Sequence, residues 1–106
     1  MEPTVVHFEG EAVIHLLDDV ARVTVELKAG RDRHSVGGQI AEGPRWWVGR
    51  VAWETRPLSR DIEPGSVICI ELSNGRVADA VVEDTSPDPV PDAAIRGLGP
   101  PPFEVP

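Results

Sequence analysis

The chain has few cysteines and few aromatic residues other than tryptophan. Its 106 residues include one Cys, no Tyr and two Phe. A single cysteine excludes a disulfide within the chain and fits a reducing compartment. No apolar run approaches the roughly 18 residues that a membrane-spanning helix needs. The segment 1–10 lacks the basic and apolar regions of a signal peptide, so we expect a cytoplasmic protein.

Basic residues are also scarce, because ten Lys and Arg face eighteen Asp and Glu, for a net charge of −8. This balance argues against nucleic acid and membrane surfaces as partners. The charge is uneven, since residues 31–60 sum to +3 and the remainder to −11. A positive middle could attract an anionic ligand. Solvated loop arginines would give the same pattern, and both interpretations stay open.

The length fits one domain spanning residues 1–106. Convincing helical spacing is missing, whereas apolar residues alternate with polar ones, as in Val23–Leu27, which is typical of half-buried strands. The sequence therefore predicts an all-β fold, a small antiparallel barrel of six or seven strands in a meander. A β-sandwich is the alternative. Residues 84–106 are rich in proline, and we expect a short strand near 93–97 and an extended tail that packs on the barrel.

Turn signals predict how the strands pair. A turn at Asp18–Ala21 would place Ile14 opposite Val25 and Ala12 opposite Leu27, which matches their apolar faces.

All three tryptophans lie within residues 46–53. A turn at Glu42–Arg45 would place Gly38 opposite Gly49 on the inner face. Trp47 and Trp53 would flank this gap, whereas Trp46 and Arg50 would point outward.

Two interpretations of the gap remain open. In one, the glycines let the sheet bend and an indole ring covers them. In the other, they form the floor of an apolar pocket with indole walls. The candidate ligand-binding residues are Trp47, Trp53, Gly38, Gly49, Ile40 and Val51.

Asn74-Gly75 is a strong hairpin signal that suits a two-residue type I′ turn. This turn would place Asp79 among inward aliphatic side chains, where a carboxylate could act as general acid or base. A bulge that turns Asp79 outward, or a position at the barrel mouth, is the alternative. His34 is the best histidine for proton transfer, near Trp53, and a solvated loop histidine is the alternative.

The same hairpin would be apolar on both faces, with Val67, Cys69, Ala78, Ala80 and Val82 outside. The tail with Phe103, or a second subunit, is the expected cover.

The sequence gives little support for a metal site, a cofactor site or a nucleophilic cysteine. His7 and His15 are too far apart along one strand to share an ion, and His34 stands alone, so we expect no metal site. No cofactor motif is present. We expect Cys69 to behave as a small hydrophobe and Arg50 to pair with Glu26, Glu71 or another acid.

Four segments, in order, resemble a small bacterial domain family of unknown function. They are Phe8–Ala12, Val23–Leu27, Trp47–Arg50 and Gly97–Phe103. Members of that family occur alone or at the C-terminus of flavin-dependent monooxygenases. The resemblance implies a compact β domain linked to oxidative or secondary metabolism, and it assigns no catalytic residue.

Three functional hypotheses follow. The first is a barrel that binds an apolar or partly anionic small molecule. The second is an enzyme of the cyclase or isomerase kind, in which Asp79 or His34 assists. The third is an interaction module, a homodimer or a partner of a flavin monooxygenase.

Overall fold

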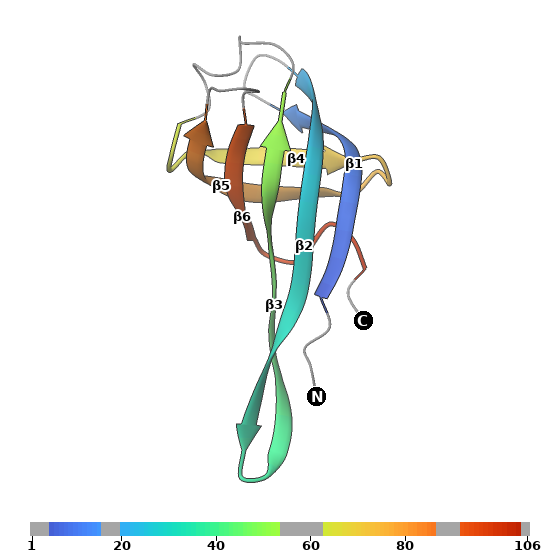
Figure 1. Ribbon diagram of the computed structural model, residues 1–106. Helices are drawn as coiled ribbons and strands as arrows, with labels where there is room; N and C mark the ends of the chain where they lie inside the picture. The colour runs from blue at the N-terminus through green and yellow to red at the C-terminus, as the bar shows by residue number, and fades with distance from the viewer. Residues whose placement is uncertain (1–4, 16–19, 54–62, 87–91, 105–106) are drawn as a thin grey trace.

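The computed structural model describes residues 5–15, 20–53, 63–86 and 92–104, and these form six strands (Figure 1). No helix among them is long and apolar enough to cross a membrane. The strands are β1 (Val5–His15), β2 (Val20–Val36), β3 (Gln39–Ala52), β4 (Val67–Leu72), β5 (Val77–Ser86) and β6 (Asp92–Leu98).

The six strands form a closed antiparallel barrel in the order β1-β2-β3-β6-β5-β4. The predicted all-β barrel is confirmed, and β6 confirms the short strand expected near residues 93–97. The order is consecutive within β1–β3 and within β4–β6. After β3 the chain instead reaches β4, which pairs with β1 and closes the barrel. Closure leaves no edge strand in the barrel itself.

The barrel interior is filled by aliphatic side chains and two indole rings. Every second residue of β2 from Val23 to Ala29 is buried, as the alternation predicted. No buried residue among those described is polar or charged. The largest side chains that are fully enclosed are Trp47, Ile14, Ile70, Ile95, Val25, Val51 and Val82.

The first hairpin keeps the predicted faces but not the predicted register. Ala12 lies opposite Val23 rather than Leu27, and Ile14 lies opposite Ala21 rather than Val25. Each pairing is displaced by an even number of residues. Because side chains alternate with a period of two, such a displacement leaves the same residues facing inward.

The second hairpin turns at Gly37-Gly38, so the predicted turn at Glu42–Arg45 is wrong. Both glycines have positive φ, +57° and +81°, which suits the tight turn between Val36 and Gln39. Gly43 and Pro44 lie within β3 instead, at a register shift, where a proline without an N–H is tolerated.

The tip of this hairpin extends well beyond the barrel, as a two-stranded arm made by the end of β2 and the start of β3 (Figure 1). The arm makes the molecule long, with extents of 52 × 25 × 24 Å. It leaves the barrel near Gly30 and Trp46, which lie opposite each other where β1 begins to pair with β2.

The β4–β5 hairpin differs from its prediction by a single residue. Gly75 has φ +85°, whereas no described non-glycine residue has positive φ, so Asn74 does not adopt the type I′ conformation. The Gly75 N–H donates to the Leu72 carbonyl and the Leu72 N–H to the Arg76 carbonyl, which closes a three-residue loop. Asp79 therefore pairs with Cys69 rather than with Ile70.

This one-residue displacement exchanges the two faces of β5. Ala80 and Val82 are buried and Ala78 packs against the core, so the prediction that these three face outside is wrong. On β5 the outer face carries Val77 and Asp79 instead, both exposed, whereas Val67 and Cys69 of β4 lie on the outer face as predicted.

Residues 99–104 cross the end of the barrel near the start of β1. Phe103 is buried and stacks on Phe8, with 5.7 Å between ring centroids. The Asn74 side-chain amide donates to the Pro102 carbonyl at 3.1 Å, and Arg76 pairs with Glu104 at 2.7 Å. Phe103 thus contacts β1 rather than covering the outer face of the β4–β5 hairpin.

Candidate functional site

A groove forms where β3 and β6 separate at the base of the arm. The ladder between them ends at the pair Val48 and Arg96. Beyond it, β6 continues only along β5, to the pair of Leu98 with Asp79. Gly99, with φ +76°, then turns the chain away, and the prolines that follow offer no N–H to prolong a ladder.

The groove has a volume of about 730 Å³, which is in the range of small-molecule sites. Its lining combines two indole rings, two guanidinium groups and several small apolar residues. The lining residues are Pro44, Arg45, Trp46, Trp47, Val48, Arg96, Gly97, Gly99 and Pro100. None of them is acidic, and none is a histidine or cysteine.

The two arginines of the groove differ in their partners. Arg96 lies 3.4 Å from Glu83, its neighbour across the outer face. Arg45 forms no ion pair with any described residue. It lies opposite Arg31 on β2, so two cationic residues meet at the base of the arm. The pKa of Glu104 is lowered by its hydrogen bond from Arg76 and by the Arg76 charge, and the charge of Arg45 lowers it further.

Trp47 forms the inner wall of the groove. Its side chain is 1% exposed, and its Nε1 is a buried donor with no acceptor among the described residues. The ring lies against Gly97, where an added Cβ would overlap the indole. Gly97 follows Arg96, the last residue of β6 that pairs with β3. The Trp47 ring occupies the space that a side chain at Gly97 would need.

A family model covers both the barrel and the groove. The model described as Domain of unknown function (DUF4873) matches residues 6–105. The chain belongs to this family. No curated protein and no solved structure matches the chain. The match includes all six strands of this DUF4873 domain, from Val6 onward.

The structure separates the residues predicted to bind a ligand. Trp47 and Trp53 face inward as predicted, and Trp46 and Arg50 face outward. Gly38, however, lies in the turn of the arm, and Gly49 lies opposite Leu27, so the predicted Gly38–Gly49 gap does not exist.

The remaining predicted lining residues lie in the barrel interior or outside the described side chains. A Cβ on Gly49 would overlap the Leu27 side chain and the Glu26 carbonyl, so no space is left there. Val51 and Trp53 belong to the packed core of the DUF4873 domain. The side chain of Ile40 lies outside the described residues. Of the predicted set, Trp47 alone lines the groove.

The two predicted acid–base residues do not meet. Asp79 is exposed on the outer face, so its predicted place among inward aliphatics is wrong; the three-residue loop, rather than a bulge at Asp79, turns it outward. His34 pairs with Ala41 near the tip of the arm, at the opposite end of β3 from Trp53, so the two are not neighbours. The His34 side chain lies outside the described residues.

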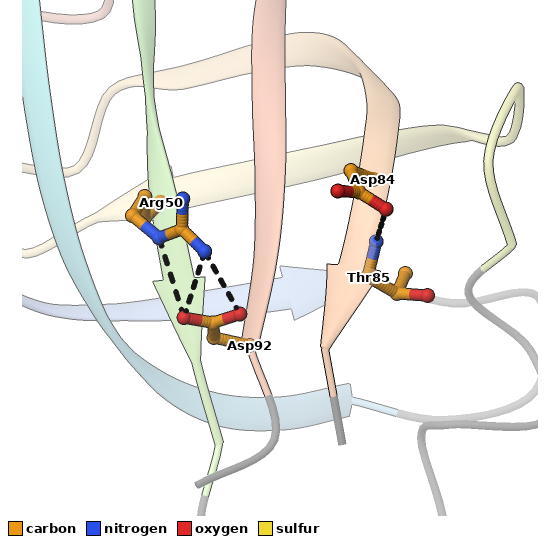
Figure 2. A network of polar contacts seen from close by, with 4 residues as sticks. All are labelled: Arg50, Asp84, Thr85 and Asp92. Carbon is orange, nitrogen blue, oxygen red and sulfur yellow. Dashed lines mark hydrogen bonds and ion pairs between the residues drawn. The ribbon is translucent and has the colours of Figure 1, made fainter. Parts of the chain in front are cut away.

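Arg50 takes part in a structural ion pair, as predicted, and its partner is another acid, Asp92. Figure 2 shows the guanidinium of Arg50 on β3 facing the Asp92 carboxylate on β6, with N–O distances of 3.1 and 3.2 Å. The Arg50 side chain is half exposed, so the pair contributes no more than about 1 kcal/mol.

Cys69 lies half-buried on the outer face and is a weak nucleophile. Burial raises the pKa of the Cys69 thiol, and the Asp79 and Glu71 carboxylates raise it further. Because the thiolate is the reactive form, less of it is present at neutral pH than in an ordinary cysteine.

Proposed function

We propose that this domain binds a small molecule with an apolar body in the groove between β3 and β6. The observation that carries the proposal is the groove itself, about 730 Å³ beside Trp46 and Trp47. Mostly apolar concave sites with a few polar groups are typical of ligand pockets. In line with the family resemblance, the ligand would belong to oxidative or secondary metabolism.

The lining favours binding over acid–base catalysis. Arginine does not lose its proton in proteins, and the groove offers no other ionisable side chain. Neither Asp79 nor His34 is among its residues. An enzyme of the cyclase or isomerase kind would need an acid or base that this groove does not provide.

A second candidate is an interaction module. Val67 and Val77 on the outer face are 62% and 58% exposed, and the arm projects away from the barrel. Either feature could contact a second copy of the chain or a flavin-dependent monooxygenase. This candidate requires a stable complex in solution.

The binding proposal is tested by titrating the protein with a broad panel of hydrophobic metabolites. We expect a saturable change in tryptophan fluorescence with at least one compound, because two of the three tryptophans line the groove. A Val48→Glu variant should lose this response, since it places an acid in the groove. The matched Val67→Glu variant, on the exposed outer face, should keep it. A panel without any response would contradict the proposal.

A further inference from the structure

The charges of the groove identify the kind of ligand that it favours, and this step rests on the proposed function. The lining contains two cationic side chains and no anionic one. The chain as a whole carries a net charge of −8. The two arginines of the groove repel cationic ligands. The net negative charge of the whole chain repels ligands that carry several negative charges.

We infer that the groove binds a planar aromatic carboxylate, with its carboxylate group at Arg45 and its ring beside Trp46. Arg45 is the available cation, because Arg96 is already engaged by Glu83. A guanidinium can hold a carboxylate through two parallel hydrogen bonds. One guanidinium balances one negative charge, which favours a monoanion over a phosphate dianion.

The aromatic part of the ligand follows from the tryptophans. Trp46 is half-buried, so part of its ring is accessible, whereas Trp47 closes the inner wall. Aromatic rings pack against an indole face in offset stacks or edge to face. The space beside Gly97 is filled by the Trp47 indole, but no atom lies within 4 Å of where a Cβ on Gly99 would stand, which leaves room for a flat ring beside Gly99.

The test compares compounds that share one ring and differ in charge. Binding of a naphthoate, its neutral naphthamide, a naphthylmethylammonium and a naphthyl phosphate is measured by calorimetry on the full chain. We expect the naphthoate to bind about 10-fold or more tighter than the naphthamide, as a charge-assisted hydrogen bond provides. The ammonium compound should bind weakest, and the phosphate no tighter than the naphthoate.

Two charge-matched variants locate the effect. Arg45→Gln should abolish the preference for the naphthoate over the naphthamide. Arg22→Gln removes the same charge from an exposed position of β2 that does not line the groove, and it should preserve the preference. Circular dichroism and the unfolding midpoint confirm that both variants are folded.

Other results would refute the carboxylate inference, the role of Arg45 or the proposed function. Equal binding of naphthoate and naphthamide to the wild type would refute the carboxylate inference and leave the proposed function intact. Tighter binding of the phosphate would also refute it. An equal loss in Arg22→Gln and Arg45→Gln would assign the effect to the overall charge rather than to Arg45. Failure of all four compounds, together with a silent metabolite panel, would overturn both proposals.

Discussion

Replacement of Trp47 by alanine should lower the free energy of unfolding by about 3–5 kcal/mol, the usual cost of truncating a large buried aromatic side chain. The indole of Trp47 is 1% exposed and belongs to the barrel core. Its removal would leave a cavity beside Gly97, which has no side chain to fill it. The change is measured from the urea midpoint at an unchanged slope.

Trp46→Ala is the matched control, because it deletes the same side chain from the adjacent residue. Trp46 points outward and is only half-buried, so its loss should cost about 1 kcal/mol, typical of a point substitution outside the core. Equal destabilisation by the two substitutions would mean that the assignment of inner and outer faces along β3 is wrong.

Gly97→Ala should destabilise the domain by about 1–3 kcal/mol, although it adds only one methyl group. A Cβ at this position would overlap the Trp47 indole, a rigid ring that is itself enclosed. Either the ring or β6 must shift, and the barrel leaves little freedom for either. Unfolding in urea measures the cost.

A double-mutant cycle shows whether the ring causes this cost. In a Trp47→Leu background the smaller side chain leaves room for the methyl group, so Gly97→Ala should become nearly neutral. A coupling energy between the two sites would appear as non-additivity. If Gly97→Ala costs as much in both backgrounds, the cost arises in the backbone of β6 rather than in the contact with Trp47.

Inward and outward faces could be predicted from the sequence more reliably than pairings. Alternation identified Ile14 and Val25 as core residues even though their predicted partners were displaced, because displacement by an even number of residues preserves each face. Asp79 shows the opposite case. The loop at Gly75 has three residues rather than the predicted two, so every side chain of β5 faces the opposite side of the sheet from its prediction. Asn-Gly suits both a two-residue turn and a longer one, so local sequence could not decide between them.

The turn of the arm had a signal that could have identified it. Gly37-Gly38 is a two-residue hairpin sequence, and the competing Gly43-Pro44 resembles a turn but lies at a register shift within β3. Because the chain turns at Gly37-Gly38 rather than at Glu42–Arg45, Gly38 lies away from the tryptophans and the predicted gap does not form.

The groove could not be derived from local patterns. It brings residues 44–48 together with residues 96–100, and this contact depends on the pairing of β3 with β6. No hairpin signal specifies a pairing between strands that are not consecutive. Neither interpretation of the Gly38–Gly49 gap holds, and the glycine that an indole does cover was not predicted. The glycine is Gly97.

The three indole N–H resonances in an ¹⁵N-labelled sample, each assigned by a Trp→Phe variant, show where the ligand binds. Saturation with the tightest ligand of the panel should shift the signals of Trp46 and Trp47, which line the groove, and leave Trp53 in the core unchanged. A ligand that binds and shifts Trp53 while leaving Trp46 unchanged would place the site in the barrel interior and contradict the account.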